Sequence, residues 1–259
     1  MIGELLPGLT NHLWQSTLFA TVAALLTAAF RKNRAHIRYW LWLSASLKFL
    51  VPFSFLIGLG SLLAWTPAAK SIATQAVSFT VVQITQPFPQ TFSAMPSVPR
   101  ATNWILIAVF AVWACGSVVT ALQLLRGWLR IRAAVRSSIP LEIGRPIEIR
   151  SCPGLLEPGV VGLDVAGWSR PIVLLPAGIL ERLTPHQLEA VLAHELCHVR
   201  RRDNLTAALH MLVEAVFWFH PFVWWIGARL VEERELACDE DVLRLGNEPR
   251  VYAESILSV

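Results

Sequence analysis

The 259-residue chain is 54% hydrophobic and 15% charged, with a net charge of +4. Soluble domains are typically about 45–50% apolar and about 25% charged, so this composition argues against an ordinary soluble domain. Arg and Lys cluster at the ends of long apolar runs, where they act as topology signals, so the positive charge does not predict direct nucleic-acid binding. The four cysteines show no spacing that indicates disulfides, and we expect reduced, packed thiols at Cys115, Cys152, Cys197 and Cys238.

Three apolar runs reach the roughly 20 residues that a helix needs to cross a bilayer. We expect spans near 13–30, 37–65 and 104–125, the second interrupted by Pro52. Basic residues follow the first and third runs, whereas the loop 66–103 is rich in Pro, Ser, Thr and Gln. The positive-inside rule therefore places this loop and the N-terminus outside. No basic segment precedes the first run, so we expect it to remain as an anchor instead of being cleaved.

Lys48 lies well inside the second apolar run. A charge at that depth is costly unless it is paired or near water, so Lys48 either belongs to a functional site, or snorkels to the interface or bonds a carbonyl freed by Pro52. Glu214 is a conceivable partner, and both readings stay open.

The sequence character changes after Pro140, where short runs of strand-forming residues alternate with turn signals. These runs predict a small sheet: Ile147–Ser151, Val160–Leu163 and Pro171–Leu175. A helix follows, because Thr184 is placed to cap it, Pro185 suits its first position and Gln187 completes a capping box.

That helix carries the segment His194-Glu195-Leu196-Cys197-His198. Two His four residues apart project from one helix face, so both imidazoles can bind one zinc ion. Glu195 points about 100° away from His194, which keeps it off the metal but near a water whose proton it can accept as the catalytic base. The alternative is a polar helix face with two incidental His.

A catalytic zinc site usually has three protein ligands and one open position, so one ligand is still needed. Glu235 and Asp239 lie four residues apart in an acidic run, on one face of a helix. We predict Glu235 as the third ligand of one Zn²⁺ per chain and Asp239 as the carboxylate that orients a ligand.

The apolar stretch 205–230 separates His198 from Glu235. If it crossed the bilayer, the ligands would lie about 30 Å apart. We therefore predict a membrane-associated helical hairpin that breaks at His220-Pro221, because Pro disfavours helix at the residue before it. His220 is then an interfacial or capping residue and not a ligand.

Five segments together resemble the BlaR/MecR-type membrane metallopeptidases, a gluzincin family of β-lactam-sensing transducers and their relatives. They are Pro171–Pro176, His194–His198, Arg200–Asn204, His220-Pro221 and Glu235–Asp239. The resemblance covers nearly the whole chain. It implies a cytoplasm-facing zinc protease in the bacterial cytoplasmic (inner) membrane. The wider gluzincin group, which includes CAAX-processing proteases, shares the H-E-x-x-H and E-x-x-x-D pair.

The expected fold is a multi-pass α-helical membrane protein with an inserted α+β gluzincin-type zinc metallopeptidase domain. Residues 1–126 form the membrane domain and 127–259 the peptidase domain. The resemblance implies an integral-membrane endopeptidase that hydrolyses a cytoplasmic or membrane-proximal protein, such as a transcriptional repressor, in signal transduction. In signalling members a sensor domain triggers cleavage. This chain stops at Val259 inside an expected helix, so it is either a fragment or a relative without the sensor, and β-lactam sensing does not follow.

Two other functions fit the sequence less well. A non-proteolytic membrane signalling or scaffold protein would keep a structural zinc site, but such sites usually have four Cys or His ligands, and Glu195 would have no role. A transporter-like bundle built on Lys48 and Glu214 lacks any internal repeat.

Four further features have two readings each. Arg200–Arg202 are expected to complement a helix C-terminus and lipid headgroups instead of contacting substrate. Asp203 either orients a ligand His or pairs with one of these Arg residues. Tyr252 is expected to pack in the core instead of stabilising an oxyanion. The strand 171–176 either packs within the sheet or pairs, as an edge, with an extended substrate.

Overall fold

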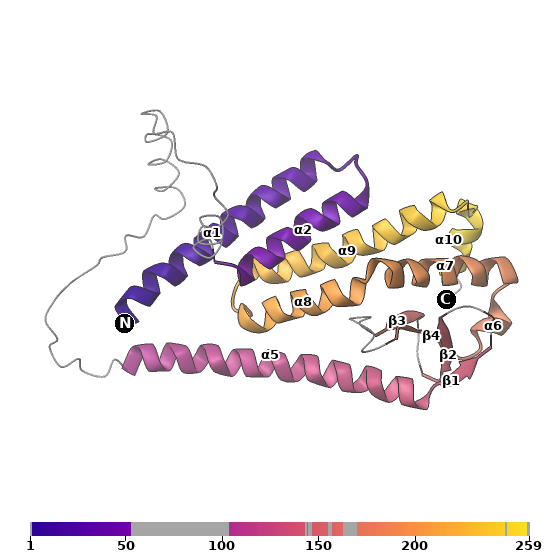
Figure 1. Ribbon diagram of the computed structural model, residues 1–259, viewed down its shortest axis with the longest axis horizontal. Helices are drawn as coiled ribbons and strands as arrows, with labels where there is room; N and C mark the ends of the chain where they lie inside the picture. Colours follow the sequence, from indigo (N-terminus) through magenta and orange to yellow (C-terminus); the bar gives the residue numbers. More distant parts are fainter. Residues whose placement is uncertain are drawn as a thin grey trace, which may run out of the picture.

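The computed structural model describes residues 2–52, 104–142, 144, 147–154, 157–162, 170–246 and 248–257 (Figure 1). Helices form a bundle, and a small sheet packs beside one end of it. The described helices are α1 (Ile2–Ala29), α2 (Ala35–Leu50), α5 (Trp104–Ser137), α6 (Ile179–Arg182), α7 (Pro185–Arg201), α8 (Asp203–Val216), α9 (Pro221–Arg244) and α10 (Pro249–Leu257). The strands are β1 (Ile139–Leu141), β2 (Glu148–Cys152), β3 (Gly159–Val161) and β4 (Ile172–Pro176).

Helices α1, α2, α8 and α9 share one apolar core. Phe49, Val213 and Ile226 are almost completely buried in it, and Trp42 meets Trp225 edge to face at 4.9 Å between ring centroids. Dispersion and apolar burial along these long faces hold the α9 axis against α2.

Helix α8 ends at Val216 and α9 begins at Pro221, so the predicted break at His220-Pro221 is confirmed. His220 occupies the cap position of α9, and its Nε2 lies 3.1 Å from Thr17 Oγ1. Figure 1 shows α7 and α8 running end to end with α9 folded back alongside them. This return brings the second half of α9 to the helix that carries the H-E-x-x-H motif. The position of the α8–α9 hairpin relative to a membrane stays a prediction.

Among the described residues, one helix is long and apolar enough to cross a membrane by length and composition. This is α5, whose most apolar window has a mean hydropathy of 2.4. Because α5 runs from Trp104 to Ser137, the predicted span 104–125 and the basic segment after it form one continuous helix. The first predicted span, 13–30, lies in α1 up to Ala29, and the second begins in α2, but neither helix as described meets this criterion. The rest of the second span beyond Pro52 and the loop 66–103 lie outside the described residues.

The sheet has the order β1-β2-β4-β3, with β2 and β4 parallel and the outer pairs antiparallel. The predicted sheet is confirmed, with strand bounds shifted by one or two residues and β1 added. Val173 pairs with Ile149 on one side and Val160 on the other. The reading of 171–176 as an edge strand is therefore wrong, because β4 has a neighbour on each side. The edge that faces α7 is β3.

Lys48 is buried in the bundle and donates to Ser16 Oγ on α1 at 3.4 Å. Glu214 lies 3.2 Å from His210 Nε2, one turn away on its own helix. Gly227 on α9 makes room for this pair, since a Cβ there would lie 2.6 Å from His210 Nε2. Lys48 and Glu214 thus contact different polar groups inside the bundle, so the conceivable pairing between them is not seen among the described residues.

Candidate metal centre

Helix α7 presents the H-E-x-x-H motif, and its predicted start is confirmed. Thr184 caps the helix, and the Thr184 and Gln187 side chains form the reciprocal capping box. The helix ends at Arg201, and the capping residue Arg202 adopts the left-handed conformation (φ 57°, ψ 40°). Helix α8 begins at the next residue, Asp203, whose carboxylate lies beside His198 in the last turn of α7.

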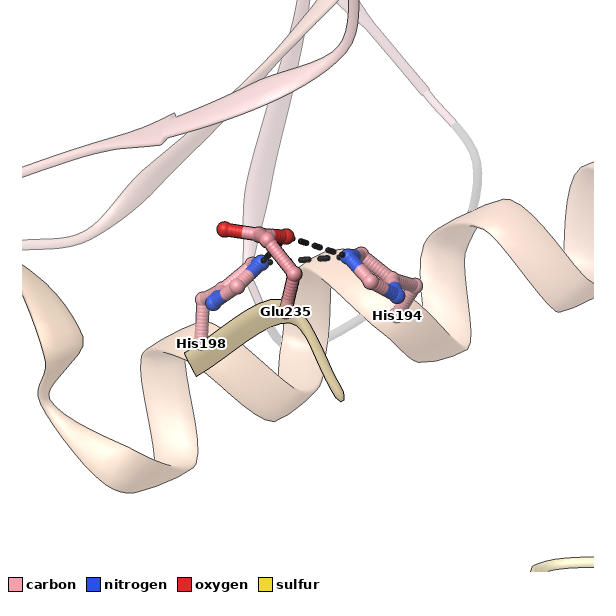
Figure 2. Close-up of side chains that lie close together, drawn as sticks. All are labelled: His194, His198 and Glu235. Atoms are coloured by element: carbon pink, nitrogen blue, oxygen red, sulfur yellow. Dashed lines mark hydrogen bonds and ion pairs between the residues drawn. The ribbon is translucent and has the colours of Figure 1, made fainter. Parts of the chain in front are cut away.

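The structure brings together the three side chains that the sequence singles out as metal ligands (Figure 2). The Nε2 atoms of His194 and His198 are 3.1 Å apart, and Glu235 Oε2 lies 3.4 Å and 3.5 Å from them. Tetrahedral donors about 2.0–2.1 Å from one Zn²⁺ lie roughly 3.3 Å from each other. Both the donor types and their spacing therefore fit one zinc ion with a fourth position open.

Each imidazole has a polar partner at its Nδ1 atom, on the opposite side of the ring from Nε2. His198 Nδ1 lies 2.7 Å from Asp203 Oδ2, and His194 Nδ1 lies 2.7 Å from Tyr252 OH and 3.3 Å from Asp239 Oδ1. Such partners fix the tautomer that leaves Nε2 free to bind a metal. Asp239 thus lies where the sequence analysis placed it. Asp203 makes both of the contacts that its two readings require, because its other oxygen accepts from Arg201 Nε at 3.2 Å.

Glu235 uses one carboxylate oxygen toward the two imidazoles and the other toward Arg234. Arg234 Nη2 lies 2.8 Å from Glu235 Oε1. This ion pair leaves Oε2 as the oxygen that faces the histidines and favours coordination through a single oxygen.

The centre is electrostatically suited to a cation. Burial opposes protonation of His194, but its bonds to Asp239 and Glu235 prevail and raise its pKa to about 10. Burial acts likewise on His198, whose pKa rises to about 9 because of Asp203 and Glu235. Burial raises the pKa of Glu235, but the two imidazoles outweigh it and hold that pKa far below its usual range. A divalent cation in this place would replace the two imidazole protons and meet carboxylates already ionised.

Glu195 is 7% exposed and lines the same cleft as the three grouped side chains, without belonging to their set. Burial raises its pKa, and the nearby His198 and His194 offset part of that rise. A carboxylate with a raised pKa beside a metal position suits proton transfer.

A cleft of about 620 Å³ opens over the centre. The edge strand β3 forms one wall with Gly159 and Val160, and α9 and α10 supply Arg234 and Ile256. Asn204 Nδ2 donates to the carbonyl oxygens of Val160 and Gly162, at 2.9 Å each, and so ties this wall to the start of α8. The cleft thus borders all three donor side chains, His194, His198 and Glu235.

Tyr252 lies at the metal centre through contacts that its sequence position did not predict. It is 5% exposed, as core packing predicts, yet its hydroxyl donates to Asp239 Oδ1 at 2.5 Å and contacts His194. Burial and the Asp239 carboxylate raise its pKa well above the ordinary value. No spacing rule links α10 to α7, so the sequence offers no local signal for this contact.

A second donor group, formed by His198, Asp203 and Cys238, overlaps the first. Cys238 Sγ lies 3.4 Å from His198 Nδ1, the atom that already bonds Asp203. In this second group, Asp203 and Cys238 lie at the Nδ1 side of His198, and we infer that they orient its ring and do not form a separate metal site. All four cysteines are free thiols, and Cys152, Cys197 and Cys238 are buried, as expected, whereas Cys115 is exposed, so the expectation of a packed thiol is wrong there.

Comparison with known proteins adds independent evidence. The chain matches the family model described as BlaR1 peptidase M56 over residues 9–259. It is 29% identical over 149 residues to "Regulatory protein BlaR1" of Bacillus licheniformis, covering 53% of this chain and 24% of that protein. It is 24% identical over 173 residues to "Methicillin resistance mecR1 protein" of Staphylococcus aureus, covering 60% of this chain and 29% of that protein.

A "Protease HtpX homolog" of Moorella thermoacetica is 48% identical over 59 residues, covering 22% of this chain and 20% of that protein. The chain thus spans 24% to 29% of the length of the BlaR1 and mecR1 relatives. Because the family model matches nearly the whole chain, the protein belongs to the BlaR1 peptidase M56 family.

Proposed function

We propose that this chain is an integral-membrane zinc endopeptidase in which His194, His198 and Glu235 bind the metal and Glu195 is the catalytic base. The spacing of the three donor atoms, 3.1–3.5 Å, carries the proposal, because it matches three ligands of one tetrahedral ion. Family membership and the likeness to HtpX proteases support peptide-bond hydrolysis.

When bound, zinc would supply Lewis-acid activation of the attacking water and of the scissile carbonyl. Glu195 accepts the proton of that water and then delivers it to the leaving amine. Asp203 and Asp239, the latter through Tyr252 as well, hold the imidazoles in the metal-binding tautomer. The cleft wall β3 orients the substrate backbone.

We further propose the topology inferred from the sequence. The chain crosses the bacterial cytoplasmic membrane several times, with its N-terminus outside, and residues 127–259 form the peptidase domain facing the cytoplasm. The α8–α9 hairpin lies in or against the membrane without crossing it. The substrate is a cytoplasmic or membrane-proximal protein. A transcriptional repressor is the first candidate, since the likeness to a "Regulatory protein" supports a role in signal transduction.

The test compares wild type with Glu195→Gln and His194→Ala in detergent-purified protein. Bound zinc is measured together with cleavage of labelled casein and of the chain itself. We expect one zinc per chain in wild type and Glu195→Gln, proteolysis in wild type alone, and loss of zinc in His194→Ala. Unchanged proteolysis in Glu195→Gln would remove Glu195 as the base. Zinc without proteolysis in wild type would favour a scaffold with a structural site.

A further inference from the structure

We propose that Tyr252 is a positioning residue of the metal centre. Its hydroxyl group bridges Asp239 and His194 by hydrogen bonds, and through this bridge Asp239 orients the His194 ring. The inference rests on the proposed zinc site and extends it to α10, the last described helix.

The hydrogen-bond directions follow from the chemistry of the three groups. An ionised Asp239 can only accept, so the Tyr252 proton points to it across 2.5 Å. The Tyr252 oxygen is then the acceptor for His194 Nδ1–H at 2.7 Å. The direct distance from His194 Nδ1 to Asp239 Oδ1 is longer, 3.3 Å. The carboxylate therefore acts on the imidazole largely through the phenol.

The position of the hydroxyl is set by packing that does not involve the metal. The Tyr252 ring packs with Ala190 and Val242 in a small core between α7, α9 and α10. Its plane is inclined 28° to the His194 ring, with centroids 6.2 Å apart. A rigid ring in a packed core places the oxygen before any ion binds, which is the condition for preorganised coordination.

The same contacts separate this role from transition-state stabilisation. A phenol has one O–H group, and that of Tyr252 donates its hydrogen bond to Asp239. It is therefore not directed at a developing oxyanion. We therefore expect loss of the hydroxyl to weaken zinc binding more than turnover at saturating zinc.

The test measures zinc affinity by chelator competition in detergent-purified chains. Tyr252→Phe removes the hydroxyl and keeps the ring. Ser255→Ala is the matched control, because Ser255 is buried in α10 and bonds the Tyr252 carbonyl oxygen at 2.6 Å. We expect zinc affinity to fall about 10- to 100-fold in Tyr252→Phe, as for loss of other supporting partners, and less than about threefold in Ser255→Ala.

A double-mutant cycle with Asp239→Asn sharpens the result. If the phenol relays the carboxylate, Tyr252→Phe adds little to the loss already caused by Asp239→Asn. Unchanged affinity in Tyr252→Phe, an equal loss in Ser255→Ala, or fully additive losses would each overturn the inference. Failure of the proposed function looks different, since wild type itself would then lack zinc or lack Glu195-dependent cleavage.

Discussion

Replacement of Asp203 by Asn tests how much the turn between α7 and α8 contributes to metal binding. Asp203 is 1% exposed and accepts from His198 Nδ1 at 2.7 Å and Arg201 Nε at 3.2 Å. An amide has one acceptor oxygen and no charge, so it can satisfy only one of these donors. The loss of a charge-assisted bond to a ligand His should lower zinc affinity about 10- to 100-fold, or about 1.4–2.7 kcal/mol.

Chelator competition at fixed pH measures this change, with Asp241→Asn as the control. Asp241 forms an ion pair with the largely exposed Arg200 at 2.9 Å and does not contact either proposed ligand His. Its replacement by Asn therefore removes the same charge near α7 without removing a partner of the metal centre. We expect its zinc affinity to stay within about threefold of wild type, as exposed ion pairs contribute little. The reasoning is refuted if Asp203→Asn binds zinc as tightly as Asp241→Asn.

Three more predictions follow from the structure. The pKa values of about 10 for His194 and about 9 for His198 mean that both rings are protonated at neutral pH without metal, so zinc binding releases two protons. Zinc affinity should therefore fall as pH decreases from about 8 to 6, by up to about 100-fold per unit, and a pH-independent affinity would contradict the assigned ligands. Gly227→Ala should lower the thermal unfolding temperature, because its Cβ would lie 2.6 Å from His210 Nε2, a clash that typically costs about 1–3 kcal/mol; an unchanged temperature would show that the bundle adapts. Cysteines introduced at the two flanks of 205–230 should react with an impermeant reagent from the same membrane side, and labelling from opposite sides would disprove the hairpin.

The sequence predicted those parts of the site that depend on local rules. The capping box, the i, i+4 histidines and the i, i+4 pair of Glu235 and Asp239 are all set within one helical turn or two. The break at His220-Pro221 was found by a longer argument, since ligands for one ion cannot lie across a bilayer.

The remaining features depend on contacts between distant segments. Nothing in 171–176 reveals that β4 is flanked on both sides, because the parallel pairing with β2 is decided by tertiary packing. Tyr252 reads as a core residue, and its ring is one, while the role of its hydroxyl depends on how α10 docks against α7. The helix α5 continues past the predicted span because its basic segment also favours helix.

Asp203 and Asn204 are neighbours in the chain, and their side chains contact different parts of the site. Asp203 bonds the ring of His198, and Asn204 donates to the carbonyl groups of Val160 and Gly162 on the cleft wall. Two adjacent residues therefore connect the His198 ring to the cleft wall, each through hydrogen bonds of its own side chain. Because one peptide bond joins the two residues, a displacement of the wall would be transmitted to the imidazole through these hydrogen bonds.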